Sequence, residues 1–286
     1  MSETTELTSP PSLARLYAQA VLGPIVPGRD SELPDRRIAM TGAAVAEERV
    51  ASYCRVCGFR MRSDVPGTFP HLLVFPLHLC LMTDRSFPFS ALGLVHIANR
   101  IELLAPIRVG SPLDLSVHAE DLRPHRRGRQ FDLVSEASLD DRVAWRSRST
   151  YLSRGGDSEG ASGDDEEHED GSAEDLEITS EWRIPGDIGR RYAAISGDRN
   201  PIHMHPLSAR LFGFPTAIAH GMWTKARCLA AFEGRTGETY EIEAEFGSPV
   251  RIPGRARFLS GRRGDAWRFR VETPDGEHRN LIGSIS

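Results

Sequence analysis

Three polar residues suited to proton transfer lie within six positions of the chain: Asp198, Asn200 and His203. Glycine and proline interrupt regular structure at both ends of this stretch, so residues 197–206 are predicted to form a loop. The ordinary pKa of histidine is near neutrality, so His203 could hold a water molecule and exchange its proton. Asp198 could be a second acid/base or could orient His203, and Asn200 could donate a hydrogen bond to the water or to a substrate.

A second feature follows His203 after seventeen residues, where His220 and Gly221 stand at the start of a predicted helix. The first turn of a helix has free N–H groups and a dipole that favours negative charge. Gly221 has no side chain to keep a carbonyl group away from its N–H. We therefore predict that the Gly221 N–H stabilises a negatively charged oxygen, and we interpret His220 as a structural residue at the helix start.

The two features together resemble the signature of the MaoC-like, or (R)-specific, enoyl-thioester hydratases. That signature reads Gly-Asp-x-Asn-Pro-hydrophobic-His, then His-Gly-hydrophobic, and it is matched by residues 197–203 and 220–222. The resemblance implies a catalytic pair of Asp198 and His203, with Gly221 as the oxyanion donor and no metal or other cofactor. It also implies reversible hydration of trans-2-enoyl thioesters to (3R)-3-hydroxyacyl thioesters in fatty-acid metabolism. The whole chain is similar to the double hot-dog 3-hydroxyacyl-thioester dehydratases of mycobacteria and other actinobacteria.

The elements around the loop are predicted from hydrophobic spacing and from breaker residues. In the second half we expect helices at 187–196 and 220–232, a helical turn at 208–212, and strands at 240–246, 256–259, 266–271 and 280–285. The first half is predicted to contain strands at 97–104, 113–119, 130–137 and 143–152. The pattern by itself predicts an α+β fold. The resemblance implies that this fold is a tandem hot-dog, in which each antiparallel sheet wraps around one helix.

The two halves can be aligned, because residues 53–58 parallel 192–197 and residues 105–109 parallel 248–252. In this alignment Phe59 and Asp64 stand in the places of Asp198 and His203, and Phe75-Pro76 stands in the place of His220-Gly221. Proline has no N–H to donate. We therefore predict a degenerate first half that binds substrate, and one active site per chain.

Four segments are predicted along the chain: an N-terminal extension (1–35) without an assigned role, a degenerate hot-dog domain (36–153), an acidic disordered linker (154–177) and a catalytic hot-dog domain (178–286). Residues 157–177 contain eleven acidic and no basic residues, which prevents a packed core. Without these eleven charges the formal net charge of −5 becomes +6. A mildly basic folded part suits an anionic ligand.

Composition excludes several classes of protein. No apolar run reaches the roughly 18–20 residues that span a bilayer, and no secretory signal is recognised, so we expect a cytoplasmic protein. The lone CxxC pair, Cys54 and Cys57, lacks a second pair at ligand spacing and is interpreted as buried thiols. No glycine-rich nucleotide motif and no metal-ligand cluster is recognised, and no nucleic-acid partner is expected.

The expected partner is an acyl-CoA or acyl-carrier-protein thioester, and the chain could be a monomeric pseudo-dimer or a homodimer. Two alternatives to a hydratase stay open. A hot-dog thioesterase would need a carboxylate on the central helix, where Glu233 at the far end is the only acid. A catalytically silent acyl-thioester-binding protein would be expected to have lost one of the three polar residues of the loop.

Overall fold

The computed structural model describes residues 3–22, 32–155 and 176–286, so most of the predicted acidic linker lies outside the described residues. The elements of the first part are β1 (Glu3–Leu7), α1 (Leu13–Leu22), β2 (Arg36–Ala44), α2 (Glu47–Cys57), α3 (His71–Met82), η1 (Ala91–Gly93), β3 (Leu94–Leu103), β4 (Pro112–His125), β5 (Gly128–Leu139) and β6 (Arg142–Arg154). Those of the second part are β7 (Glu177–Ile184), α4 (Ile188–Ser196), α5 (Pro201–Met204), α6 (Pro206–Leu211), α7 (Gly221–Ala230), β8 (Tyr240–Phe246), β9 (Gly254–Arg263), β10 (Ala266–Glu272) and β11 (Arg279–Ile285).

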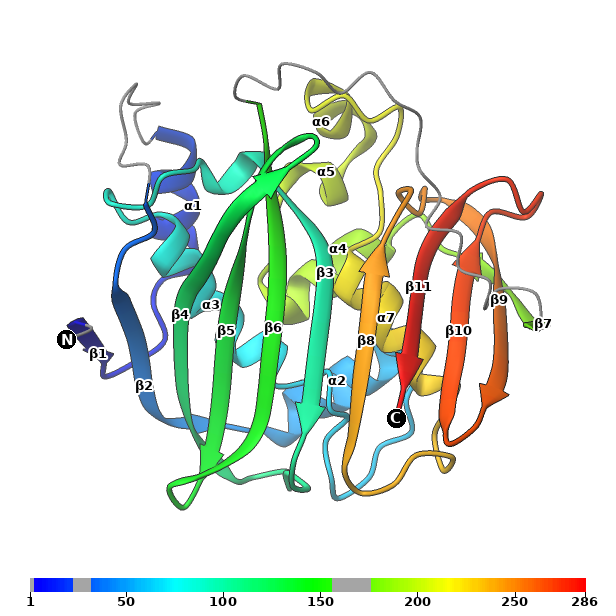
Figure 1. Ribbon diagram of the computed structural model, residues 1–286, viewed down its shortest axis with the longest axis horizontal. Helices are drawn as coiled ribbons and strands as arrows, with labels where there is room; N and C mark the ends of the chain where they lie inside the picture. Colours follow the sequence, from blue (N-terminus) through cyan, green and yellow to red (C-terminus); the bar gives the residue numbers. More distant parts are fainter. Residues whose placement is uncertain (1–2, 23–31, 156–175) are drawn as a thin grey trace.

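The strands form one eleven-stranded sheet with the helices on one side of it (Figure 1). Its order is β1-β2-β4-β5-β6-β3-β8-β11-β10-β9-β7. Without β1, the five strands before the junction β3–β8 repeat in reverse order after it, so that β2 corresponds to β7 and β6 to β11. The long helices α3 and α7 hold equivalent places. The predicted tandem hot-dog fold is therefore confirmed, whereas the exact domain boundaries stay a prediction.

The junction between the two units is the antiparallel pair β3–β8, with Ile101 opposite Ile242. Helix α7 lies behind it and carries a fully buried lysine, Lys225. Its Nζ donates to the carbonyl oxygen and the Oδ1 of Asn99 (2.8 and 2.6 Å) and to the carbonyl oxygen of Ile242 (2.9 Å). Burial lowers the pKa of Lys225, but three oxygen acceptors match the three hydrogens of an ammonium group. One side chain therefore joins α7 to a strand of each unit.

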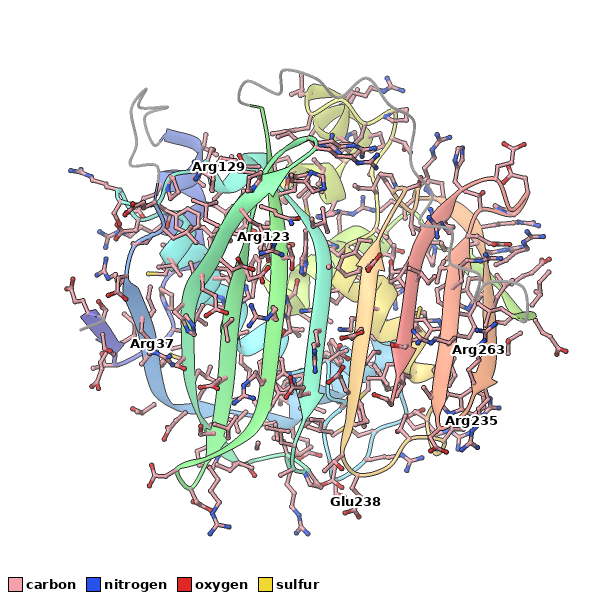
Figure 2. All side chains as sticks on the ribbon, in the orientation of Figure 1. Arg37, Arg123, Arg129, Arg235, Glu238 and Arg263 are labelled. Atoms are coloured by element: carbon pink, nitrogen blue, oxygen red, sulfur yellow. The ribbon has the colours of Figure 1, made fainter. Side chains whose placement is uncertain are left out.

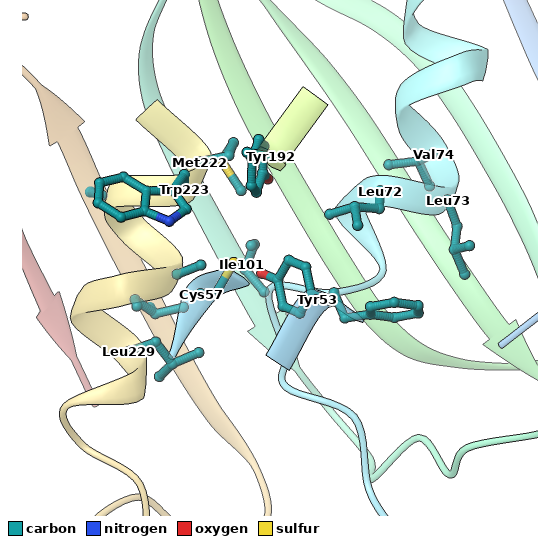
Figure 3. Packing of buried hydrophobic residues seen from close by; sticks show 14 of the residues in the cluster. Tyr53, Cys57, Leu72, Leu73, Val74, Ile101, Tyr192, Met222, Trp223 and Leu229 are labelled. Atoms are coloured by element: carbon teal, nitrogen blue, oxygen red, sulfur yellow. The ribbon is translucent and has the colours of Figure 1, made fainter. Parts of the chain in front are cut away.

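The core lies between the sheet and the helices. Figure 3 shows Tyr53 of α2 and Tyr192 of α4 between the side chains of α3 and those of α7. Both tyrosines are almost fully buried. Each belongs to a helix that ends at a glycine in the left-handed conformation, Gly58 (φ 88°) and Gly197 (φ 81°). The aligned segments 53–58 and 192–197 are therefore the same helix end in the two units.

The opposite face of the sheet is covered by charged side chains (Figure 2), as expected for an antiparallel sheet with one face in water. Arg100 on β3 forms ion pairs with Glu241 (2.5 Å) and Glu243 (3.6 Å) on β8, and these pairs cross the junction on its outer side. These ion pairs are partly exposed to solvent, and such pairs contribute little to the free energy of unfolding. The junction therefore depends mainly on the strand pairing and on the buried face.

The strands and long helices predicted by spacing are present, with differences at their ends. The predicted loop 197–206 contains a short helix, α5, because the Asn200 side chain caps it and Pro201 occupies its first position. Strands β1, β2 and β7 were not predicted. The N-terminal extension joins the fold, since β1 pairs in parallel with β2 and α1 connects them.

The alignment of the two halves was wrong between the helix ends and the central helices. Asp64 forms an isolated antiparallel bridge with Arg108, and Ile218 forms the same bridge with Arg251. Asp64 therefore corresponds to Ile218 and not to His203. From Gly58 to Asp64 the chain advances six residues, whereas from Gly197 to Ile218 it advances twenty-one. The first unit lacks the whole segment that carries Asn200, His203, α5 and α6.

The same bridges correct the expected place of the first helix start. Two residues beyond Asp64 and Ile218 stand Pro66-Gly67 and His220-Gly221, whereas Phe75 and Pro76 lie inside α3. The Gly67 N–H donates to the Tyr240 hydroxyl (3.0 Å). The N–H that corresponds to Gly221 is therefore present in the first unit but already bound to the protein.

Among the described residues, no helix is both long enough and apolar enough to cross a membrane.

Replacing Lys225 with methionine is expected to destabilise the protein by about 2 kcal/mol or more, because three buried oxygens of the junction lose their donor. Thermal and urea unfolding would measure the loss. Arg100→Met removes ion pairs from the outer side of the same junction and should cost less than about 1 kcal/mol. Equal effects of the two substitutions would contradict a special role of the buried lysine.

Candidate active site

The predicted site residues converge at the start of α7. A carboxylate oxygen of Asp198 and one ring nitrogen each of His203 and His220 lie within 4.8 Å of one another. Asp198 follows the left-handed glycine that ends α4, His203 lies in α5, and His220 is the residue before α7. The imidazole rings of His203 and His220 are stacked, with their centroids 3.7 Å apart. The segment that the first unit lacks thus brings His203 to the N-terminus of the central helix, beside Asp198 and His220.

The hydrogen bonds of the two histidines define their protonation. His203 Nδ1 lies 2.8 Å from the Ile218 carbonyl oxygen, and His220 Nε2 lies 3.0 Å from the Asp198 carbonyl oxygen. A carbonyl oxygen only accepts, so each of these nitrogens carries the proton. In neutral His203 the bare nitrogen is then Nε2, which can accept a proton. Asp198 is not the hydrogen-bond partner of His203, so its expected alternative role of orienting His203 through such a bond is not supported.

Asp198 is held through one of its two carboxylate oxygens. Oδ1 accepts from the Tyr17 hydroxyl and from the Asn200 N–H, both at 3.1 Å. Oδ2 lies 3.8 Å from His220 Nε2, and about a quarter (26%) of the side chain is exposed. The carboxylate is therefore fixed through Oδ1, while the side chain as a whole stays partly exposed.

The electrostatics give these groups distinct protonation states at neutral pH. Burial opposes ionisation of Asp198, but His220, His203 and the hydrogen bonds to Oδ1 outweigh it and lower the pKa of the carboxyl. Burial lowers the pKa of His203, partly offset by Asp198, and burial together with His203 lowers the pKa of His220 to about 3. The site thus holds a carboxylate beside two neutral imidazoles.

The other two predicted residues have defined environments. Asn200 Oδ1 accepts from the Ile202 N–H (3.3 Å), so the observed contact of this side chain is a helix cap. Gly221 is the first residue of α7, and a Cβ built on it would lie 3.0 Å from the ring of Phe246. No carbonyl one turn earlier can accept the N–H of a first helical residue. Gly221 is thus required for packing and also presents a helix-end N–H beside His220.

Four residues near the site were not predicted. Tyr17 comes from α1, and no local pattern connects it with a loop 181 positions away. His71, His96 and Tyr151 come from the first unit. Burial lowers the pKa values of the two histidines and raises that of Tyr151, and the charge of Asp198 acts upward on each of them. Among the described residues, His71 Nδ1 and His96 Nε2 have no hydrogen-bond partner. The first unit therefore contributes polar side chains to the surroundings of Asp198.

Two further expectations concern a metal and a thioesterase. One carboxylate and two imidazoles at this spacing could hold a divalent cation, although His203 Nδ1 and His220 Nε2 already donate to carbonyl groups. Glu233, the acid considered for a thioesterase, lies beyond the other end of α7, and its carboxylate accepts from the Arg60 N–H (3.1 Å). The geometry therefore offers no carboxylate on α7 beside Gly221.

Comparison with known proteins agrees with this fold. Residues 172–280 match the family model described as MaoC like domain. The chain is 37% identical to 3-hydroxyacyl-thioester dehydratase X of Mycobacterium tuberculosis over 280 residues, which cover 98% of this chain and 99% of that protein. A crystal structure of that dehydratase superposes with a TM-score of 0.77 at 34% identity, covering 87% of this chain and 99% of the other.

More distant structures share the fold. A MaoC-like dehydratase from Phytophthora capsici has a TM-score of 0.68 at 16% identity and covers 87% of this chain and 93% of its own. A Mycobacterium tuberculosis protein described as having a double hot-dog fold has a TM-score of 0.53 at 14% identity, with coverages of 85% and 92%. The architecture defines a double hot-dog protein. With the near-full-length relative, it follows that the chain belongs to the MaoC-like dehydratase family.

Stability should fall as the pH decreases below about 6.5, because five histidines (His71, His78, His96, His203 and His220) have pKa values lowered by burial. The unfolded chain then binds protons before the native state does, at a cost of about 1.4 kcal/mol per histidine per pH unit until the folded pKa is reached. For His71 that limit is a pKa of about 4. Urea unfolding at pH 7.5, 6.5 and 5.5 measures the slope.

His78→Gln supplies the matched variant, since His78 is fully buried and its Nε2 bonds to Ser135 Oγ (2.7 Å), away from Asp198. The slope below pH 6.5 should be smaller in this variant by one histidine. A free energy of unfolding that stays constant between pH 7.5 and 5.5 would contradict the prediction.

Proposed function

We propose that this chain catalyses the reversible hydration of trans-2-enoyl thioesters to (3R)-3-hydroxyacyl thioesters. The observation that carries the proposal is the placement of an ionised Asp198 and a neutral His203 beside the first N–H groups of α7. The near-full-length relative is a 3-hydroxyacyl-thioester dehydratase, which supports the same reaction class. The expected setting is cytoplasmic fatty-acid metabolism, with acyl-CoA or acyl-carrier-protein thioesters as substrates.

In the proposed mechanism one water molecule donates hydrogen bonds to Asp198 Oδ2 and to His203 Nε2. A carboxylate oxygen of Asp198 and a ring nitrogen of His203 lie within 4.8 Å of each other, and two acceptors at such a separation can share one water, because each hydrogen bond is about 2.8 Å long. As the water oxygen bonds to C3 of the enoyl group, one of the two acceptors takes its proton. The pair then supplies a proton to the α-carbon, and in dehydration the same steps run in reverse.

The thioester oxygen becomes negative while the C3–O bond forms. We assign its stabilisation to the Gly221 N–H and the dipole of α7, which act where the charge develops. Lys225 anchors the next turn of α7 on the same face, since it lies four residues beyond Gly221. The first unit supplies no second site in this proposal, because its equivalent N–H is bound to Tyr240 and its Asp–His segment is absent. In this proposal the two units of one chain take the place of two subunits. The chain then acts as a monomer or as part of a homodimer.

Purified protein should hydrate members of a trans-2-enoyl-CoA series from four to sixteen carbons, measured as loss of enoyl absorbance. His203→Ala and Asp198→Asn should each lower kcat by roughly 10²–10⁴-fold, because each removes a proton-transfer group. His205→Ala is the matched control, since His205 is exposed and caps α6 through its Nδ1. EDTA should leave the rate unchanged if no metal takes part.

No hydration at any chain length or with an acyl-carrier-protein substrate, by a folded protein that still binds the thioester, would contradict the proposal. That result would favour the silent binding protein. Release of free thiol instead of loss of the enoyl group would favour the thioesterase.

Gly221→Ala should lower kcat by roughly 10²–10³-fold if the helix-end N–H acts as the oxyanion donor. The new methyl group would press on the Phe246 ring and move the first turn of α7. Phe246→Leu in the same chain makes room for this methyl group and should restore part of the rate. A Gly221→Ala variant with unchanged kcat would contradict the assignment of this N–H.

A further inference from the structure

The N-terminal extension contacts the loop that carries Asp198. Tyr17, in the second turn of α1, donates from its hydroxyl to Asp198 Oδ1 (3.1 Å) and accepts from the Arg199 N–H (2.7 Å). Leu13, one turn earlier on the same face of α1, packs against Gly197, where any Cβ would overlap its Cδ1. The two contacts hold consecutive residues of the loop, so α1 is seated on the segment from Gly197 to Arg199.

These contacts decide how the carboxylate is oriented. The terminal torsion of an aspartate is broad and does not hold one orientation by itself. Here Oδ1 has two donors, the Tyr17 hydroxyl and the Asn200 N–H, which direct Oδ2 toward His220. Loss of the hydroxyl would leave a single donor, and the carboxylate could then turn about it.

The Tyr17 phenol remains a donor at all working pH values. Burial, and next the charge of Asp198, raise its pKa above the ordinary value for tyrosine. A neutral phenol that donates to a carboxylate favours the ionised form of that carboxyl. The bond therefore acts on the orientation of Asp198 and also on its charge.

We propose that Tyr17 is a positioning residue for Asp198, so that a helix preceding the first hot-dog unit completes the active site of the second. The inference rests on the proposed function, in which Asp198 exchanges the proton of the attacking water. Tyr17 acts through Asp198 and is assigned no contact with the reacting atoms. The extension is thus part of the catalytic unit, although 181 positions separate Tyr17 from Asp198.

The test compares Tyr17→Phe with Tyr53→Phe in the full chain. Both substitutions remove one hydroxyl and keep the ring, but the Tyr53 hydroxyl donates to Thr68 Oγ1 (2.7 Å) within the first unit. Tyr17→Phe should lower kcat for trans-2-enoyl-CoA roughly tenfold or more with little change in KM, since the carboxylate is misplaced and not the substrate. The acidic limb of its kcat/KM–pH profile should move to higher pH, because ionised Asp198 loses a donor.

Tyr53→Phe should keep the wild-type pH profile even if its stability falls. A Tyr17→Phe enzyme with the wild-type kcat and pH profile would overturn the inference, and so would an equal shift of the profile in both variants.

Two readouts do not depend on activity and keep failure of this inference separate from failure of the proposed function. The Arg199 amide should exchange its hydrogen faster in Tyr17→Phe, because its acceptor is gone, and the Asp198 pKa measured by carboxyl NMR should rise. If the wild-type chain hydrates no thioester, the proposed function fails while these readouts still test the Tyr17–Asp198 bond. Unchanged amide exchange and an unchanged Asp198 pKa would overturn the inference whatever the activity.

Discussion

The structure depends on the way α7 is fixed to the junction between the two units. Gly221 packs against Phe246 and Lys225 binds the carbonyl of Ile242, so the helix lies along β8 in the opposite direction. Lys225 also reaches Asn99 on β3, whose Nδ2 donates to Ser147 Oγ (2.9 Å) and Ser149 Oγ (3.0 Å) on β6. The N-terminus of α7, which faces the reaction in our proposal, is therefore held by buried polar contacts to both units. Such contacts are costly to break because the groups left behind would stay buried without partners.

The two units share an architecture but not a chemistry, and the difference is largely one of length. Between equivalent helix ends and bridges, the second unit has twenty-one residues where the first has six. The added residues form α5 and α6 and carry Asn200 and His203 next to His220. In the first unit the short connection carries no counterpart of Asn200 or His203, and the Gly67 N–H is bound by Tyr240 from the second unit. The first unit instead contributes buried neutral imidazoles, and α1 covers the Asp198 loop.

Burial controls the protonation of the site. A carboxylate remains ionised there because it accepts hydrogen bonds from Tyr17 and Asn200 and lies beside two histidines. The imidazoles remain neutral because burial, which lowers their pKa values, outweighs the charge of Asp198 and the hydrogen bonds to backbone carbonyls, which raise them. A neutral histidine has one ring nitrogen without a proton. It can therefore accept a proton without first having to lose one. The low exposure of the site thus favours the proton transfers that the proposed reaction requires.

Much of this could be predicted from the sequence by itself, because the determining signals are local. Period-two strands, the glycines that end α2 and α4, and the spacing of Asp198, Asn200, His203 and Gly221 are read within short windows. The alignment of the halves was correct at the helix ends and at residues 105–109, where the same local pattern recurs. It was wrong between them, since an insertion changes the spacing without leaving a periodic signal. The three-dimensional structure was needed to show that Gly67 corresponds to Gly221, that Lys225 binds both units, and that Tyr17 contacts Asp198. The contacts of Lys225 with Asn99 and of Tyr17 with Asp198 join residues more than a hundred positions apart. They exist because the strands of the two units pair at β3–β8 into one sheet and the helices pack on one side of it, which no local pattern encodes.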